Sequence, residues 1–298
     1  MNKSIIIHQV CGGSGGLGDF IRAGLSFYSF SRKHELEYFI DLSGYKYLNL
    51  CFDLEIIPEN IKKIPSEKIW LMNITGKIQN NTLQKIIDEP KVYYLISNAI
   101  GFEENSDVNT YIDDFFNIKL KPSARVLDYI ENMYKHLGII ENKYVSFHTR
   151  CGDKIMCLNN DEQLNKTHIL VNIDDVNIYD KYTKFINDFI AKYNVTYPII
   201  IHSDSKIFKN KLRENNNNLM VIDNEIRHNS ENIGIDTIES NVQSVGELYI
   251  IAKSFCIFSN TYSGFSHMAS LIHKKRFYTS IAHHGYYNFL NCKNITSI

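Results

Sequence analysis

The sequence predicts an α/β protein with two parallel sheets, and three observations support this fold class. Short apolar runs, such as the isoleucines at 199–201, recur along the chain and are typical of strands buried on both faces. Helix-like stretches separate these runs, and this alternation is characteristic of parallel sheets built from right-handed crossover units. The chain has 298 residues, which is long enough for two such domains.

The first half contains four strand-like runs and several stretches with helical spacing of apolar residues. Ile21, Leu25 and Tyr28 indicate a helix after the first run, and a later helix ends at Gly138, which suits a helix C-cap. The expected strands are 4–10, 36–41, 68–72 and 91–97, and the expected later helices are 81–89, 108–116 and 124–138.

The second half repeats the pattern, so we expect two Rossmann-like domains, 1–140 and 141–298. In the helix-like stretch 180–193, four aromatic residues share one side. The expected strands are 144–150, 197–203, 219–223, 255–259 and 275–280, and the expected helices are 180–193, 206–214, 244–254 and 263–273.

Composition places the chain among soluble globular proteins, because 44% of its residues are apolar and 22% are charged. The formal net charge of −1 leaves no basic surplus for binding nucleic acid through many phosphate contacts. The six cysteines form no C-x-x-C pair and no zinc-finger spacing, so we expect reduced thiols in a cytoplasmic protein. The sequence shows neither a signal peptide nor a run of 18 apolar residues, so we expect no membrane span.

A glycine-rich loop follows the first strand-like run. Residues 13–18 match the pattern G-x-G-x-x-G, and Asp41 lies 23 residues beyond Gly18, at the end of the second strand-like run. This is nearly the fingerprint of a dinucleotide-binding domain, so an NAD(P)-dependent oxidoreductase or epimerase is one hypothesis. That hypothesis also needs a catalytic Tyr-x-x-x-Lys or an equivalent, and the sequence supplies no convincing one.

Ligands of open α/β sheets bind at the carboxyl ends of strands, so the residues after each strand are candidates for a site. His148 and Arg150 alternate along the strand 144–150 and therefore point to the same face. Arg150 has the fork of donors that binds a phosphate or a carboxylate, and Lys154 adds a second positive charge. An ordinary surface Arg–Asp pair is the structural alternative.

Two further strand ends carry polar residues. Asp204 follows a strongly apolar strand and can accept two parallel hydrogen bonds from guanine, whereas a helix N-cap is the alternative. A Ser/Thr/Gly turn after 255–259 opens a helix, and backbone N–H groups at a helix N-terminus form a natural anion site. Ser263, Gly264 and Phe265 would be the donors there, and a strand–turn–helix with a serine cap is the alternative.

The order and spacing of these segments resemble the fucosyltransferase superfamily with a GT-B fold, which includes the α-1,2-, α-1,6- and protein O-fucosyltransferases. Residues 15–19, GGLGD, look like its N-terminal loop G-G-x-G-N/D. Residues 148–154, HTRCGDK, resemble its segment H-x-R-x-G/T-D-K, and 199–204, IIIHSD, look like its strand ending in a small residue, Thr or Ser, and Asp. Residues 247–271 resemble its last block, which is a helix, a short strand and a helix start.

The resemblance covers most of 10–30 and 143–275, and it implies a fold and an activity. The implied fold is GT-B-like, with two Rossmann-like domains whose parallel sheets face each other across a cleft. The implied activity is inverting glycosyl transfer from a GDP-sugar, with GDP-fucose favoured, to a glycan hydroxyl. The domain 1–140 would hold the acceptor, and the domain 141–298 would hold the nucleotide-sugar donor.

The resemblance also implies roles for the donor-site residues. Arg150 would bind the β-phosphate and offset charge on the leaving group, and Lys154 would add positive charge. His148 would support the phosphates or the ribose, and Asp204 would bind guanine. The backbone N–H groups of 263–265 would bind the pyrophosphate.

The residues on the acceptor side are less defined. Gly16 and Gly18 would give the acceptor or the donor close access to the first loop. The general base would be Asp19 or Asp153, and the sequence does not decide between them. The chain contains no Asp-x-Asp motif of the metal-dependent glycosyltransferases, so we expect neither a metal nor a cofactor beyond the donor. A non-catalytic sugar-nucleotide-binding or lectin-like protein on the same fold is a third hypothesis.

Overall fold

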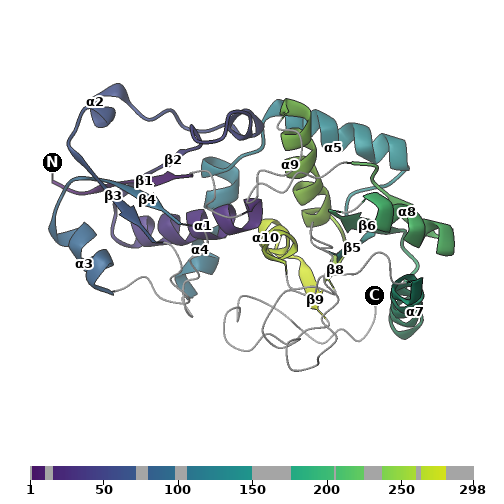
Figure 1. The fold of residues 1–298 in the computed structure, drawn as a ribbon. Helices are drawn as coiled ribbons and strands as arrows, with labels where there is room; N and C mark the ends of the chain where they lie inside the picture. Colours follow the sequence, from purple (N-terminus) through teal and green to yellow (C-terminus); the bar gives the residue numbers. More distant parts are fainter. Residues whose placement is uncertain are drawn as a thin grey trace. The chain divides into compact units, whose positions relative to one another are not determined.

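The computed structural model describes residues 2–10, 16–71, 80–97, 106–149, 176–204, 206–224, 237–259 and 263–279. These residues divide into two compact units, which Figure 1 shows as ribbons. Residues up to 127 and 237–245 belong to the first unit, and 128–224 and 246–279 belong to the second. Helices α5 (Ala124–Leu137) and α9 (Ile238–Ala252) contribute residues to both units. The domain boundary expected between 140 and 141 stays a prediction.

A parallel sheet of four strands forms the centre of the first unit. Its strands are β1 (Ile5–Gln9), β2 (Glu37–Asp41), β3 (Ser66–Trp70) and β4 (Val92–Ile96). The strand order is β2-β1-β4-β3, and each neighbouring pair is parallel. The apolar runs of β1 and β4 are buried because these strands occupy the middle of the sheet.

Strand alternation divides the side chains of the first sheet between two faces. Helix α1 (Leu17–Lys33) covers one face, where the His8 ring stacks on Phe20 with ring centroids 5.1 Å apart. The other face carries Ile5 and Ile7, which join a core cluster with a residue of α2 (Glu59–Lys62). Figure 1 shows α1 and α2 on opposite sides of the strands.

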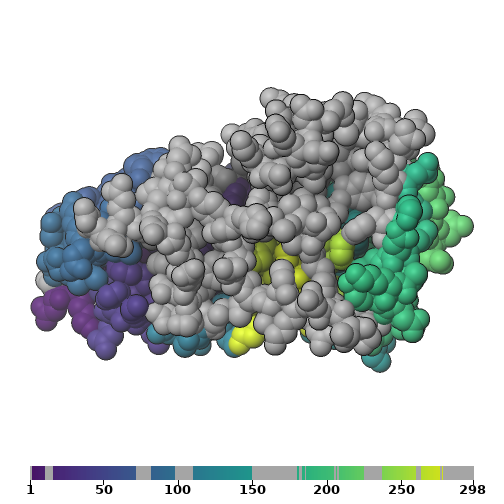
Figure 2. Space-filling view, turned by 90° about the horizontal axis from the view of Figure 1, so that it is seen from below, coloured from purple at the N-terminus to yellow at the C-terminus, as the bar shows by residue number. Residues whose placement is uncertain are grey.

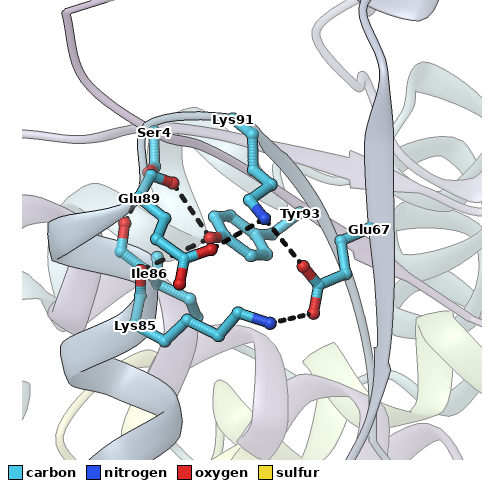
Figure 3. A network of polar contacts seen from close by, with 7 residues as sticks. All are labelled: Ser4, Glu67, Lys85, Ile86, Glu89, Lys91 and Tyr93. Carbon is cyan, nitrogen blue, oxygen red and sulfur yellow. Dashed lines mark hydrogen bonds and ion pairs between the residues drawn. The ribbon is translucent and has the colours of Figure 1, made fainter.

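The last turn of α3 (Asn80–Asp88) ends beside the amino ends of the strands, and Figure 3 shows its polar contacts. The Tyr93 hydroxyl donates to the Glu89 carbonyl at 2.9 Å, and the Ser4 hydroxyl donates to the Ile86 carbonyl at 2.5 Å. The last carbonyls of a helix have no partner within the helix, so these hydroxyls replace water as their donors.

The helix expected at 108–116 is present, but it begins two residues earlier and its last two residues belong to a different element. Helix α4 (Ser106–Asp114) continues into the π-helix η2 (Phe115–Lys119), in which the Leu120 N–H donates to the Phe115 carbonyl at 2.8 Å. Phe115 and its neighbour Phe116 are both buried. A π-turn widens the helix locally, which allows two consecutive aromatic rings to be buried. The chain also forms a short helix, η1 (Leu48–Cys51), between β2 and α2.

A parallel sheet of five strands forms the centre of the second unit. Its strands are β5 (Val145–Thr149), β6 (Ile199–Ser203), β7 (Leu219–Val221), β8 (Cys256–Ser259) and β9 (Arg276–Thr279). The order is β7-β6-β5-β8-β9, and all neighbouring pairs are parallel. The predicted α/β fold with two parallel sheets is therefore confirmed.

Helices α7 (Val176–Tyr193) and α8 (Lys206–Asn215) cover one face of the second sheet. Their buried apolar residues form one core cluster with alternate residues of β5 and β6. The outer side of α7 lies at the surface (Figure 2, green), where Lys184 and Asp188 form an exposed ion pair at 2.5 Å. This amphipathic pattern is what the aromatic stripe in 180–193 predicts.

Helices α9 and α10 (Gly264–Ile272) cover the other face. The Tyr144 hydroxyl donates to the Ile250 carbonyl of α9 and lies 2.9 Å from the Tyr134 hydroxyl of α5. Helix α9 begins at Ile238, six residues before the expected start at 244, because Thr237 and Ser240 cap its first turn reciprocally, each side chain accepting from the other's N–H at 3.1 Å.

Candidate functional site

The second sheet contains a topological switch point between β5 and β8. From β5 the chain goes to β6 and β7 on one side, and it then returns to β8 and β9 on the other side. The connections that leave β5 and β8 at their carboxyl ends therefore diverge, and ligands of open α/β sheets bind at such a point. Of the described residues predicted to bind the donor, His148 lies near the carboxyl end of β5, Asp204 follows β6, and 263–265 follow β8 in the sequence.

His148 lies at the switch point. It is opposite Ser259 of β8 on one side and His202 of β6 on the other. His148 is only 5% exposed, and its ring centroid is 5.7 Å from that of Phe265 in the first turn of α10. The structure thus brings together two residues that were predicted to bind the donor.

The N-terminus of α10 has an ordered serine cap. Ser263 is the N-cap residue in an extended conformation, and its Oγ accepts a hydrogen bond from the Phe265 N–H at 3.3 Å. A phosphate at this terminus would compete with the serine oxygen for that N–H, or it would use the neighbouring N–H of Gly264. The geometry fits both the predicted anion site and the alternative of a simple cap, so the anion site stays a prediction.

Asp204 follows β6 and is partly exposed. The Ser203 hydroxyl lies 3.5 Å from Asp204 Oδ1, which is at the limit of a hydrogen bond. Lys206, in the first turn of α8, forms an ion pair with Asp223 at 3.0 Å. The role of Asp204 in binding guanine stays a prediction.

Arg150, Asp153 and Lys154 lie outside the described residues. The last residue of β5 is Thr149. The phosphate-binding and catalytic roles of these three residues stay predictions.

Asp19 and Gly16 lie at the N-terminus of α1 in the first unit. Asp19 Oδ1 accepts from Arg22 at 2.7 Å, and Asp19 Oδ2 lies 3.4 Å from the Gly16 N–H. Gly16 has an ordinary φ of −80°, and a Cβ added there would meet no atom of the described residues within 4 Å. Neither the φ of residue 16 nor its packing against the described residues requires glycine, whereas Gly18 is buried inside the first turn. The access role of these glycines stays a prediction.

Asp41 is engaged within the protein. Its Oδ2 accepts from the Gln9 amide at 2.9 Å, and its Oδ1 accepts from the Ser43 N–H at 2.9 Å. In a dinucleotide-binding domain, this carboxylate binds the ribose hydroxyls. A ribose would have to compete with both partners, so the structure gives the oxidoreductase hypothesis little support.

Sequence reasoning missed a buried polar cluster beneath the switch point. His202 and Glu247 are fully buried, and His202 Nδ1 lies 2.8 Å from Glu247 Oε1. Ser146 and Lys209 are also fully buried polar residues of this unit. The available signal was an ionisable residue inside an apolar run, as in GELYIIA for Glu247 and PIIIHS for His202.

The described residues contain no group of three or more His, Cys, Asp or Glu side chains that could hold a metal ion. None of the described helices is both long enough and apolar enough to cross a membrane. The absence of a metal from the mechanism stays a prediction.

Comparison of the sequence with family models and with curated proteins gives no match. Comparison of the fold with solved structures does give matches. The α-1,6-fucosyltransferase NodZ, co-crystallised with GDP, superposes with a TM-score of 0.61 at 11% identity, over 91% of this chain and 93% of NodZ. POFUT1 in complex with GDP-fucose superposes with a TM-score of 0.55 at 12% identity, over 92% of this chain and 95% of POFUT1.

A third solved structure also matches the fold at low sequence identity. A mutant of FUT1 from Arabidopsis thaliana, in complex with GDP, superposes with a TM-score of 0.56 at 8% identity, over 93% of this chain and 71% of FUT1. The strand order and the switch point define a doubly wound α/β fold. More narrowly, the chain has a fucosyltransferase-like fold, as the sequence resemblance predicted.

Proposed function

We propose that this chain is an inverting, metal-independent glycosyltransferase that transfers fucose from GDP-fucose to a glycan hydroxyl. The observation that carries the proposal is the switch point of the second sheet, where His148 meets Phe265 at the N-terminus of α10. The fold gives independent support, because the similar structures are fucosyltransferases and several of them hold GDP or GDP-fucose.

In this proposal the second domain, 141–298, binds the donor. Negative charge grows on the diphosphate as its bond to the sugar breaks, and stabilising that charge lowers the barrier. Arg150, Lys154 and the positive end of α10 supply the positive potential without a metal. His148 supports the phosphates or the ribose, and Asp204 accepts hydrogen bonds from guanine.

The acceptor side is assigned to the first domain, 1–140. Transfer to a hydroxyl requires a base that removes its proton, and Asp19 and Asp153 are the candidates. Asp19 Oδ1 already accepts from Arg22, so Asp19 would take the proton on Oδ2. We assign the enzyme to the cytoplasm, and the two described cysteines, which are free thiols, agree with a reducing compartment.

Calorimetric titration with GDP and with NAD tests the donor assignment. We expect GDP to bind and NAD to give no heat, because the predicted site suits guanine and a diphosphate. A protein that binds NAD and ignores GDP would instead be the oxidoreductase of the second hypothesis. Binding of GDP without transfer to any glycan acceptor would favour the non-catalytic alternative.

Arg150→Ala tests the mechanism. We expect loss of transfer from GDP-fucose with an unchanged circular dichroism spectrum, because the variant lacks the charge that offsets the leaving group. Arg213→Ala is the matched control, since Arg213 is exposed on α8 and should leave transfer unchanged. Addition of EDTA should leave activity unchanged, and loss of activity on chelation contradicts the metal-free mechanism.

A further inference from the structure

A chain of hydrogen bonds connects β5, β6 and α9 beneath the switch point. Glu247 Oε1 lies 2.8 Å from His202 Nδ1, and His202 Nε2 lies 3.2 Å from the Ser146 Oγ. All three residues are fully buried. They come from three elements, so these hydrogen bonds connect α9 to two adjacent strands of the sheet, β5 and β6.

The order carboxylate, imidazole, hydroxyl is that of a hydrolase triad, but the position excludes this role. A catalytic serine must reach a substrate, and its oxygen must be exposed in a cleft. Ser146 has no exposed surface and points from the middle of β5 toward His202. The three residues therefore act on other parts of the protein and do not contact a substrate.

The surroundings of Glu247 favour its carboxylate form. Burial raises the pKa of Glu247, but the hydrogen bond from His202 and the charges of Lys209, His202 and His148 outweigh burial, and the pKa lies below its usual value. Lys209 Nζ is fully buried and donates to the Ile222 carbonyl at 2.6 Å. A buried carboxylate with these counter-charges places a negative charge at a fixed position beneath the carboxyl ends of β5 and β6.

The hydrogen-bonded residues Ser146 and His202 each lie two positions before a residue that is predicted to bind the sugar-nucleotide donor. Ser146 precedes His148 by two positions on β5, and His202 precedes Asp204 by two positions on β6. Alternation along β5 places His148 on the same face as Ser146. The hydrogen bond between Ser146 and His202 therefore holds the two strands together directly before His148 and Asp204.

We propose that Glu247 and His202 are positioning residues of the donor site, which through Ser146 hold the ends of β5 and β6 so that His148 and Asp204 bind a nucleoside diphosphate together. This inference rests on the proposed function. Neither residue contacts the ligand, and their effect is on the geometry of the residues that do. Glu247 also acts on His148 directly through its charge.

The test breaks the chain at two separate links and measures GDP binding by calorimetry. Ser146→Ala removes the hydroxyl on β5, and Glu247→Gln keeps the shape on α9 but weakens the charge-assisted bond to His202. We expect each variant to raise the Kd for GDP about tenfold, which corresponds to about 1.4 kcal/mol. Ser146→Thr restores the hydroxyl and should return the Kd toward that of the wild type.

Calorimetry separates positioning from simple destabilisation, because partial unfolding lowers the number of sites while a displaced site raises the Kd. Ser254→Ala is the matched control. Ser254 is also a fully buried serine of this unit, but its hydroxyl donates to the carbonyls of Ile251 and Cys256 beside the amino end of β8. We expect Ser254→Ala to leave the Kd for GDP unchanged.

The outcomes are distinct. A higher Kd in Ser146→Ala and Glu247→Gln, with full stoichiometry and an unaffected control, supports the proposal. Wild-type Kd values in both folded variants overturn it, and so does an equal rise in Ser254→Ala, which would indicate a general softening of the core. A wild-type protein that binds no GDP overturns the proposed function itself, and this is measured first.

Discussion

Helix α9 passes so close to Tyr129 of α5 at Gly246 that a side chain at 246 has no room. A Cβ added there would lie 2.2 Å from Cδ1 and 2.6 Å from Cε1 of the Tyr129 ring. The ring cannot swing away freely, because the Asn224 amide donates to the Tyr129 hydroxyl. Gly246→Ala must therefore displace either the helix or the ring together with its hydrogen bond.

The expected magnitude follows from three terms. Overpacking a core costs about 2 kcal/mol, and loss of the hydrogen bond to Tyr129 costs about 1 kcal/mol. The better helix propensity of alanine offsets about 1 kcal/mol. We therefore expect Gly246→Ala to lower the free energy of unfolding by about 2 kcal/mol, measured by urea denaturation with circular dichroism.

A double-mutant cycle isolates the steric conflict. Tyr129→Ala removes the ring, so Gly246→Ala in that background should be neutral or stabilising by up to about 1 kcal/mol, through helix propensity alone. The diagnostic result is that Gly246→Ala lowers the free energy of unfolding in the wild type and does not lower it in the Tyr129→Ala background. An equal destabilisation in both backgrounds refutes the reasoning, because the clash with Tyr129 would then not be its cause.

Three further predictions follow from buried groups. Tyr93→Phe should lower the urea-derived free energy of unfolding by about 1 kcal/mol, because its hydroxyl caps α3. Burial lowers the pKa of His8 from 6.5 to about 3, so the folded protein keeps it neutral while the unfolded chain protonates. Stability should therefore fall by up to about 1.4 kcal/mol per pH unit below about pH 6.5, and His8→Leu should flatten this slope in unfolding curves at several pH values. Burial raises the pKa of the Cys51 thiol to about 12, so mass spectrometry should find Cys51 unlabelled by iodoacetamide at about pH 8 until denaturant is added.

Much of the fold could be predicted because its signals are local. Strands β1 and β6 each begin with three consecutive isoleucines, and such apolar runs identify strands covered on both faces. The order of strands in each sheet could not be predicted, since it depends on crossovers that no local pattern encodes. The early start of α9 was missed because Ser240, three residues after the cap Thr237, stands where the usual capping box has Glu or Gln.

The candidate site could be predicted only where a strand end marks it. His148 and Phe265 were found because one ends a strand and the other opens a helix, and the structure brings their rings together. The partnership of His202 with Glu247 could not be predicted, because 45 residues separate them and the segments that contain them, 199–204 and 247–271, give neither residue a role. A charge within an apolar run predicts that a partner exists and does not say which residue it is.

The polar groups at the two sheets differ in how completely they are paired and in how deeply they are buried. At the amino ends of the first sheet, Glu67 accepts from both Lys85 and Lys91, at 2.6 and 3.0 Å, so the network closes on itself (Figure 3). The carboxylate of Glu247 is not fully paired, because its Oε2 is buried and has no hydrogen bond within the described part of the chain. A buried charge that is incompletely paired costs stability, and sites of function are where proteins tolerate such a cost. The carboxyl edge of the second sheet, where the charge of Glu247 acts on His148, is therefore the edge at which ligand binding should be tested first.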